Sequence, residues 1–594
     1  MTGSISLEPR LFTVPEASLM SEGRVIRQLI EALLFEGAVA FSGDVPDNTG
    51  ELNFRIGELD LVCRGRRGAF GRLRVQENSL RRVDADGWRC QVGLGDLVAA
   101  LNVDAAIRKR LHAELEQTVR LCDWNARRLP RPLSRRQLSF EALEGLLDEG
   151  HPYHPCFKAR TGFSVEDHRR YGPEAGETFV LHWLAIDRRS LASSLPVEEE
   201  SFWRRELGDP CWNTLQARIL QRGGSPERYG LMPIHPWQWQ ALQREGLGTP
   251  IRSGEILYLG EAGEQYRATQ SIRTLINAED PGKAHIKLPL NLVNTSSLRT
   301  LEPHSVCTAP VLSAWLKKVV DSDPFFTDIA PLILLQEYAG LLFKGAGKHL
   351  EGQLGAIWRE NLNTSLEPGE QAVPFTALFA IELDRRPFID DWIQRFGLQA
   401  WLTRLLECTV LPIWHLLVAQ GIALEAHAQN LIIVHRDGWP TRLAVRDFHE
   451  SVEYVEGFLA QPDLCPDFRA LDPVYLDDTP DRFFWMQEVE ALRELYMDTL
   501  YIYNLAELSH LLEQDYGLPE ARFWQQVHDL LERYSAGGHC DPERTALLGC
   551  TSPVIQTESL LRRKLCTSIT TECRHPIPNP FHPLSKNEAA ACFT

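Results

Sequence analysis

The decisive stretch of this chain runs from residue 422 to residue 451 and reads IALEAHAQNLIIVHRDGWPTRLAVRDFHES. It holds two short apolar runs on either side of a polar turn at residues 437–440. This pattern predicts two strands joined by a turn, so the two ends of the stretch lie close together. We therefore expect His427 and Asn430, ahead of the first strand, to converge with Asp447, after the second.

The polar residues of this stretch suit a magnesium–nucleotide site. Carboxylate and amide oxygens bind hard cations, and a neutral imidazole can donate a hydrogen bond to a phosphate or a substrate. A single histidine before a strand is more often a hydrogen-bonded structural residue. Here, however, four polar residues (Glu425, His427, Gln429 and Asn430) fall within six positions and an acid follows, which favours a functional site.

A second enzyme class shares part of this pattern. Protein-kinase-like phosphotransferases also place an asparagine before a strand and an Asp-Phe pair after the next, as Asn430 and Asp447-Phe448 do here. Those enzymes carry a catalytic aspartate two residues after the histidine, where this chain has Gln429. A kinase-like reaction therefore remains an alternative, although the chain lacks the catalytic base that this reaction needs at position 429.

Composition limits the classes of function. The chain has 594 residues, 44% of them hydrophobic and 24% charged, which predicts a globular protein of several domains. Its net charge of −18 argues against a nucleic-acid-binding protein. An acidic protein that binds an anionic substrate has to gather its basic residues locally.

Thirteen cysteines are scattered without a CxxC pair, which fits reduced thiols in the cytoplasm. The first 18 residues show no signal-peptide pattern. The most apolar long stretch, residues 402–434, is interrupted by polar residues and is too polar to span a bilayer. We therefore expect a cytoplasmic protein that does not enter the membrane.

Periodic patterns predict the elements around this stretch. Residues 20–45 and 94–128 have helical spacing, with strand-like sequence between them, so the first 145 residues form a helix-rich unit. ETFVLHWLAID (residues 177–187) and LMPIHPWQWQAL (231–242) read as strands, and His235-Pro236-Trp237 reads as a packing anchor. Helical spacing returns at residues 492–511 and 523–534, which predicts a helical cap.

Two His-Pro steps at residues 151–155 hold the backbone extended, because a residue before proline avoids the helical region. Lys158 and Arg160 follow at once. Two interpretations remain open at even odds: a rigid loop that presents cations to an anion, or a buried turn with hydrogen-bonded histidines.

A second group of polar residues lies in RATQSIRTLINAEDPGKAHIKLPLNLVNTSSLRTLEP, which begins at residue 267. Hydroxyls and single cations alternate there among apolar residues, and the alternation in IKLPLNLV predicts a strand with Lys287 at its start and Thr295 just past its end. Arginine, lysine and Ser/Thr donors bind phosphate and carboxylate oxygens. No glycine-rich phosphate loop is present, so side chains have to hold a nucleotide.

These two groups, with GHPYHPCFKARTGF and HPWQW ahead of them, resemble the NRPS-independent siderophore synthetases of the IucA/IucC type over residues 145–575. The resemblance implies an α+β, multi-domain cupped-hand architecture of mixed helices and antiparallel sheets. Its parts are a thumb (1–145), fingers with the ATP- and carboxylate-binding motifs (146–400), and a palm with the EAHAQN motif and the helical cap (401–594). It also implies an enzyme that uses ATP and Mg²⁺ to adenylate a carboxylate, usually of citrate or a derivative, and passes the acyl group to an amine or alcohol with release of AMP and pyrophosphate. A homodimer is a further expectation from the family.

The resemblance also assigns roles residue by residue. ATP phosphates are expected at the Ser-x-Arg-Thr element and at the lysine of the next strand; those residues are Ser271, Arg273, Thr274 and Lys287. The activated carboxylate is expected at Thr295, Arg299 and His427, so that His427, Arg299 and Lys287 are the catalytic group. Gln429, Asn430 and Asp447 are expected beside the nucleotide, with Asp447 and, more weakly, Glu425 as metal ligands.

Two basic positions are further candidates. Lys158 is a candidate for ATP binding, and Lys564, in the segment LLRRKLCTSIT, is a candidate for holding other carboxylates of citrate. A solvated helix face is an equally good interpretation of that segment. A non-catalytic binding protein for citrate or ferric chelates is a third hypothesis for the chain. The sequence does not disclose which carboxylate, which amine or alcohol, or which siderophore is involved.

Overall fold

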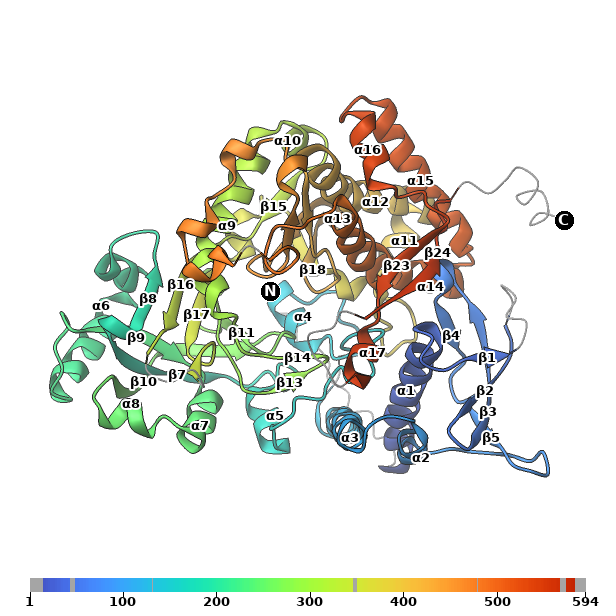
Figure 1. Cartoon of the computed structure of the whole chain (residues 1–594), viewed down its shortest axis with the longest axis horizontal. Helices are drawn as coiled ribbons and strands as arrows, with labels where there is room; N and C mark the ends of the chain where they lie inside the picture. Colours follow the sequence, from blue (N-terminus) through green and yellow to red (C-terminus); the bar gives the residue numbers. More distant parts are fainter. Residues whose placement is uncertain are drawn as a thin grey trace.

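The computed structural model describes residues 14–42, 49–130, 132–345, 350–477, 479–566 and 573–582. Helices and mainly antiparallel sheets alternate along the chain (Figure 1), which confirms the α+β class. The six-stranded, eight-stranded and four-stranded sheets are the largest in this part of the chain. The N-terminal stretch of residues 1–13 lies outside the described residues.

The decisive stretch forms the predicted hairpin. Strands β20 (Leu431–Arg436) and β21 (Trp439–Val445) are antiparallel, with Arg436 opposite Trp439. Asp437 and Gly438, the two residues of the turn, both have positive φ (50° and 91°), as a type I′ turn requires. The hairpin is extended by β18 (Gln371–Pro374) beside β20 and by β15 (Leu332–Leu334), parallel to β21. At its base the N–H of Arg446 donates to the carbonyl of Asn430, so the two ends of the hairpin meet as predicted.

The eight-stranded sheet carries the second polar group of residues. Its order is β8-β16-β17-β12-β11-β10-β7-β9. The bounds are β7 Phe179–Asp187, β8 Leu191–Ser194, β9 Tyr229–Ile234, β10 Ile256–Ala268, β11 Thr274–Asn277, β12 His285–Lys287, β16 Glu337–Phe343 and β17 Gly355–Arg359. The prediction for Lys287 was wrong in one respect, because Lys287 ends its strand instead of starting it. Pro289 has no N–H to donate to a further rung of the ladder.

The region of the His-Pro-Trp motif also departs from its prediction. The expected strand at residues 231–242 stops at Ile234, and Pro236 begins helix α7 (Pro236–Glu245). The His235 side chain caps this helix by accepting from the N–H of Trp237, and proline at the first helical position needs no hydrogen bond. His235 and Trp237 are 0% and 8% exposed, which confirms the packing anchor.

The N-terminal region combines helices with a small sheet. Its sheet consists of β1 Phe41–Ser42, β2 Gly50–Ile56, β3 Leu59–Arg67, β4 Leu73–Val75, β5 Arg81–Val83 and β6 Arg89–Cys90. Its helices are α1 Val14–Phe35, α2 Leu94–Ala100, α3 Ala105–Arg128 and α4 Phe140–Leu146. Helix α1 ends at Phe35, ten residues before the predicted end at residue 45, because the chain turns at Gly37 (φ 66°) into β1.

Helices cover the hairpin and close the C-terminal region. They are α9 Pro303–Ser322, α11 Asp390–Phe396, α12 Leu398–His415, α13 Val489–Tyr496, η11 Met497–Leu505 (a π-helix), α14 Ala506–Tyr516, α15 Glu520–Ala536, α16 Pro542–Leu548 and α17 Leu560–Leu565. The two predicted C-terminal helical segments are thus confirmed. Strands β23 (Val554–Glu558) and β24 (Arg574–Pro578) pair beside them.

The two ends of the described chain pack together. Figure 1 shows the red C-terminal elements against the blue N-terminal ones, and α17 contacts both α1 and α3. One hydrophobic core runs from Val25 through the hairpin to Phe581, whereas most of the eight-stranded sheet has a core of its own. Helix α17 therefore lies next to elements that come from the first part of the sequence, and its side chains can bind theirs.

One helix among the described residues, Leu398–Gln420, is long and apolar enough to cross a membrane. Within its most apolar window, 72% of the residues are buried inside the protein, and α12 packs on β21 of the hairpin. A helix that is buried to this extent in the protein and packs on a strand is typical of a helix in the hydrophobic core.

Candidate active site

A tight turn between β10 and β11 holds the Ser-x-Arg-Thr element. The Oγ of Ser271 accepts from the N–H of Thr274 (3.1 Å) and lies 3.2 Å from the Oγ1 of Thr269. Ile272 has a φ of 68°, which turns the backbone sharply there. The guanidinium of Arg273 donates to the carbonyl of Thr300. The hydrogen bonds of Ser271 and Arg273 therefore hold the turn that carries Ser271, Arg273 and Thr274.

Three cations gather around this turn. Lys287 is opposite Thr274 in the ladder of β11 and β12, and its side chain is 8% exposed. Arg299 donates through Nη2 to the carbonyl of Asn294 (2.8 Å) and to the Oγ1 of Thr295 (2.6 Å). Burial lowers the pKa of Arg299 to about 10 and also lowers the pKa of Lys287, and the charge of Arg273 acts in the same direction on both. Buried cations whose pKa is lowered by a neighbouring positive charge form a site that an anion stabilises.

Thr295 lies in the turn between two short strands, β13 (Val293–Asn294) and β14 (Ser297–Leu298), and has a φ of 56°. Its carbonyl accepts a hydrogen bond of 2.5 Å from the Nζ of Lys564. The next residue, Ser296, lies 2.8 Å from the Nε2 of His154. Contacts from two distant parts of the chain therefore fix the turn that carries Thr295.

His427 has a defined tautomer. Its Nδ1 accepts from the backbone N–H groups of Gln429 (3.2 Å) and Asn430 (3.3 Å), so Nδ1 is unprotonated and Nε2 carries the proton. Nε2 lies 3.8 Å from the nearer carboxylate oxygen of Glu425. The side chain of His427 is 31% exposed, which leaves Nε2–H able to donate to a substrate. The amide of Asn430 holds the loop closed by donating to the carbonyl of Glu425 (3.0 Å).

Asp447 is the point where the hairpin meets the eight-stranded sheet. Its Oδ1 accepts from Lys287 (3.2 Å) and from Arg359 (2.8 Å), while its backbone has a φ of 63°. Burial alone would raise the pKa of Asp447, but Lys287 and Arg359 hold it well below its usual range. The carboxylate is therefore ionised at neutral pH.

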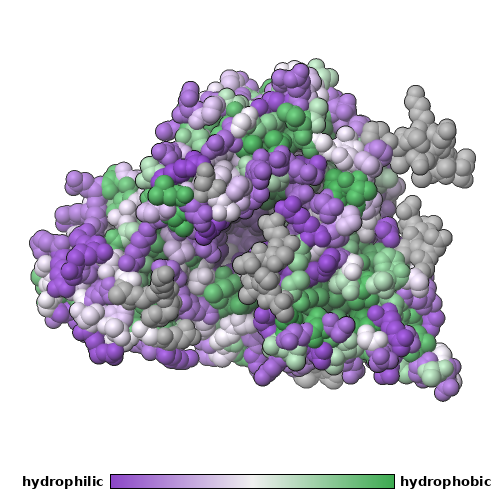
Figure 2. All heavy atoms as spheres, viewed as in Figure 1, coloured by the Kyte–Doolittle hydropathy of each residue, from purple (hydrophilic) through white to green (hydrophobic). Residues whose placement is uncertain are grey.

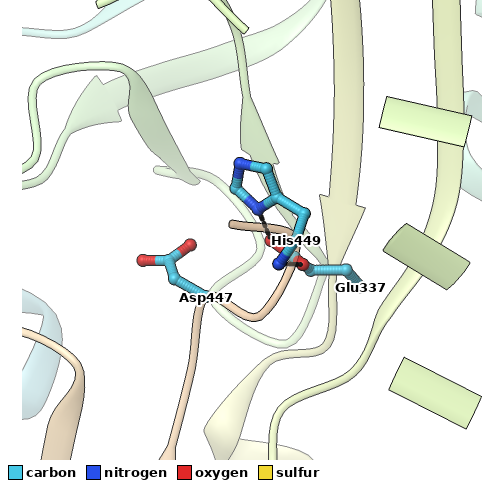
Figure 3. Close-up of side chains that lie close together, drawn as sticks. All are labelled: Glu337, Asp447 and His449. Carbon is cyan, nitrogen blue, oxygen red and sulfur yellow. Dashed lines mark hydrogen bonds and ion pairs between the residues drawn. The ribbon is translucent and has the colours of Figure 1, made fainter. Parts of the chain in front are cut away.

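Glu337, Asp447 and His449 form a group that could hold a metal ion, with ligand atoms within 4.8 Å of one another (Figure 3). Glu337 comes from β16 and accepts from the Nδ1 of His449 (2.8 Å) and from two backbone N–H groups. Of the two carboxylates, Asp447 is the better candidate to bind a metal ion, because both cations bind its Oδ1 and no described residue donates to its Oδ2. Its hard oxygen fits Mg²⁺, and Glu337 fixes the loop behind it.

The structure separates the other predicted residues from this group. Lys158 is 1% exposed, and its Nζ is bonded to Glu174 (2.6 Å) and to the carbonyl of Asp148. Arg160 binds the same Glu174, so the predicted ATP contact of Lys158 is replaced by a buried ion-pair network that ATP cannot reach. Of the two interpretations of the His-Pro segment, the buried turn is therefore confirmed.

Lys564 and Glu425 also differ from their predicted roles. Lys564 is 7% exposed and pairs with Glu114 (2.5 Å), so it is neither on a solvated helix face nor free to hold citrate. Glu425 lies outside the group around Asp447; its carboxylate accepts from the hydroxyl of Ser451 (2.6 Å). The two acids predicted as metal ligands are thus not brought together.

Several residues of the site were missed in the sequence. Glu337 and Arg359 lie on strands without a recognisable motif, and nothing in the sequence indicated that β16 and β17 pass behind Asp447. His449 stood within the decisive stretch, two residues after Asp447, and its closeness to that acid in the sequence could have identified it. His151 was weighed only as a turn residue. Burial lowers its pKa to about 3, and the charges of His427 and Arg299 act in the same direction, so His151 lies beside the site in neutral form.

Comparisons with known proteins agree with this geometry. Residues 139–380 match the model of the IucA / IucC family, and residues 399–570 match that of the ferric iron reductase FhuF-like transporters. A citryl-spermidine/3,4-dihydroxybenzoyl-citryl-spermidine:spermidine ligase of Bacillus anthracis is 34% identical over 94% of this chain and 93% of the relative.

Solved structures show the same fold. The crystal structure of the petrobactin biosynthesis protein AsbB from Bacillus anthracis superimposes with a TM-score of 0.88 at 32% identity and covers 98% of both chains. ATP-bound aerobactin synthetase IucA from Klebsiella pneumoniae has the same fold, with a TM-score of 0.75 at 19% identity over 95% of this chain and 99% of that one. The chain therefore belongs to the IucA/IucC family of NRPS-independent siderophore synthetases, which are ATP-dependent carboxylate ligases.

Proposed function

We propose that this synthetase adenylates a carboxylate of citrate or a citrate derivative and transfers the acyl group to an amine or alcohol, with release of AMP and pyrophosphate. The observation that carries the proposal is the gathering of Arg273, Lys287 and Arg299 around one turn in a protein of net charge −18. A triphosphate and a polycarboxylate repel each other, and a reaction between them needs such a group of cations.

The first step joins the carboxylate to ATP. A carboxylate oxygen attacks the α-phosphorus, the bond to the β-phosphate oxygen breaks, and pyrophosphate leaves. Ser271, Thr274 and Lys287 are positioned to hold the phosphates. Thr295 and Arg299 are positioned to hold the carboxylate, since Arg299 and the hydroxyl of Thr295 are already in contact. Holding both anions in one place removes most of the entropic cost of the encounter.

Mg²⁺ would be held by Asp447, with Glu337 behind it, and would neutralise phosphate charge when bound. Lys287 and Arg359 share Oδ1 of Asp447 and leave Oδ2 for that purpose. Gln429 and Asn430 are joined to Arg446, the residue before Asp447, through their carbonyl groups, which supports a place for them beside the nucleotide.

The second step transfers the acyl group. The nitrogen or oxygen of the nucleophile attacks the carbonyl carbon, the bond to the phosphate oxygen breaks, AMP leaves, and the nucleophile's proton passes to solvent. His427 faces this centre with a proton on Nε2, so it can donate to the oxygen that becomes negative in the transition state.

Nucleotide products test this proposal against its alternatives. The enzyme is incubated with ATP, Mg²⁺ and either citrate or a citryl monoamide, and hydroxylamine traps the acyl adenylate as a hydroxamate. We expect AMP, pyrophosphate and hydroxamate in equal amounts. ADP as the sole nucleotide product would establish the kinase-like phosphotransferase instead. Citrate binding without any nucleotide turnover would indicate a binding protein.

A further inference from the structure

A large acidic cavity opens beside the active site. Its volume is about 900 Å³, and it is lined by ten carboxylate side chains but only three arginines. Figure 2 shows the molecule hollowed near the middle of one face, with hydrophilic residues around the hollow. The lining also includes apolar side chains such as Phe483, Met486 and Leu495. Carboxylates combined with apolar walls suit a ligand that has several ammonium groups on a hydrocarbon chain.

The cavity begins at the reaction centre. Glu425 and Glu450 both line it. Glu425 lies 3.8 Å from the Nε2 of His427. Glu450 directly follows His449, and its Oε1 accepts from the N–H of Glu302 (3.2 Å), another residue of the lining. Glu450 therefore lies at the boundary between the cationic site and the acidic cavity.

Asp498 lies deeper in the same cavity. It comes from the π-helix η11 and is 9% exposed. Its Oδ2 accepts from the N–H of Glu558 (2.8 Å). Its Oδ1 is buried and makes no hydrogen bond of good geometry with the described residues, although the hydroxyl of Thr557 lies near the carboxyl group. A buried carboxylate oxygen without a donor costs free energy unless a ligand supplies one. Burial raises the pKa of Asp498 to about 7, the direction expected for a carboxyl group that lacks a cationic partner.

The neighbouring contacts connect Asp498 to the active-site loop. The hydroxyl of Thr499, the next residue, accepts from the N–H of Ala426 (2.9 Å), one residue before His427. All three arginines of the lining are paired: Arg563 with Glu558 (3.2 Å), Arg574 with Glu494 (2.8 Å) and Arg482 with Asp477. They therefore do not offset the charge of Asp498 or Glu450.

From this arrangement, and resting on the proposed function, we infer that the amine substrate is a linear di- or polyamine: one nitrogen reacts beside His427 while a second, charged nitrogen binds in the acidic cavity at Asp498. The excess of carboxylates disfavours amino acids and other amines that carry a carboxylate of their own, because like charges repel. The apolar side chains contact the methylene groups between the nitrogens.

The test compares amines that differ in their second charge. Amide formation is measured with 1,4-diaminobutane, spermidine, 1-aminobutane and L-glutamate, using one carboxylate throughout. We expect the KM for the diamine and the triamine to be roughly tenfold or more below that for 1-aminobutane, since a favourable charge contact of modest strength changes affinity by about that factor. L-glutamate is expected to be the poorest substrate. Equal KM values for diaminobutane and aminobutane, or a preference for glutamate, would overturn the inference.

Variants locate the second nitrogen. Asp498→Asn keeps the acceptor for Glu558 and removes the charge, and Glu453→Gln, a half-buried residue of the same lining, serves if Asp498→Asn fails to fold. Each variant's rate is normalised to its own hydroxamate formation, because uncharged hydroxylamine needs no cation site. The preference for diaminobutane over aminobutane should fall roughly tenfold in the variants. Asp529→Asn, on the exposed face of α15, is the matched control and should keep the full preference.

The two proposals fail in different ways. If no carboxylate gives hydroxamate, the adenylation reaction itself is wrong. If hydroxamate forms normally but Asp498→Asn lowers the rates with both amines equally, adenylation stands and the polyamine site is wrong.

Discussion

Lys287 and Asp447 form an ion pair, with 3.2 Å between Nζ and Oδ1, although 160 residues separate them in the sequence. Their motifs predicted different partners: a phosphate for Lys287 and a metal ion for Asp447. The pair joins the eight-stranded sheet to the hairpin, and thereby the two halves of the proposed site. It also keeps the lysine in place before any phosphate binds.

Removing a cation from the site should abolish most adenylation. We expect Lys287→Met and Arg299→Met each to lower the rate of acyl-adenylate formation about a hundredfold or more, because each is proposed to contact charge that develops in the transition state of that step. Pyrophosphate release with citrate measures the effect. Lys283→Met, a more exposed lysine that pairs with Glu264 just before β12, is the control and should keep its rate. Unchanged rates in the Lys287 and Arg299 variants would exclude them from the reaction.

The Nε2–H of His427 should be essential, separately from the turn that its Nδ1 stabilises. His427→Ala should abolish AMP formation and leave the fold intact. His427→Asn offers an oxygen that can accept from the N–H groups of Gln429 and Asn430, so it preserves the turn but lacks the donor. We expect the asparagine variant to be as inactive as the alanine variant, as measured by hydroxamate formation. An active asparagine variant would show that His427 acts only through the turn.

Lys564 should be a stability residue. Lys564→Met leaves Glu114 buried without its cation, which we expect to cost about 3–5 kcal/mol of unfolding free energy. Denaturant unfolding measures this, and the double variant Glu114→Gln/Lys564→Met should recover part of the loss. Arg563→Met, with a side chain 42% exposed on the same helix, should cost less than about 1 kcal/mol. If Lys564→Met instead raises the KM for citrate at unchanged stability, the lysine binds substrate directly.

Glu36 should make the stability of the protein depend on pH. Its carboxylate accepts from the N–H groups of Leu561 and Arg562 in the first turn of α17 and from the hydroxyl of Tyr153. Burial raises its pKa to about 7 against these hydrogen bonds. A raised pKa means that folding favours the protonated form, so this contribution is complete below about pH 4.5 and is lost as the pH rises through 7.

Glu36→Gln cannot ionise and should escape that loss. We expect its melting temperature, relative to the wild type, to shift in favour of the variant as the pH rises from 5 to 8, as followed by calorimetry. Glu58→Gln, whose side chain is 97% exposed, should show a constant difference over the same range. A constant difference for Glu36→Gln as well would contradict a raised pKa.

Local signals predicted the hairpin well. Gly438 in the turn and the two apolar runs were sufficient to bring Asn430 and Arg446 together, because turn chemistry and strand pairing act over short range. The Ser271–Thr274 turn and Lys287 were likewise identified from a compact motif. The strand after Lys287 was placed wrongly, since alternation extended across Pro289 and proline was given too little weight.

Long-range partners could not be predicted. Lys158 and Lys564 resembled anion-binding cations because the sequence did not show Glu174 and Glu114, which lie at distant positions and neutralise them in the interior. Glu337 was missed for the same reason, since only the tertiary arrangement brings β16 behind Asp447. A charge in a sequence discloses a requirement for a partner but not whether the partner is a ligand or another part of the chain.

The contacts of Lys564 tie the Thr295 turn to two helices. Its ammonium group reaches the carbonyl of Thr295 and the carboxylate of Glu114 on α3, so a single charge joins α17, α3 and the turn between β13 and β14. A change that moves α17 would therefore displace the Thr295 turn as well. The stability of this short helix thus sets how firmly Thr295 is held for its substrate.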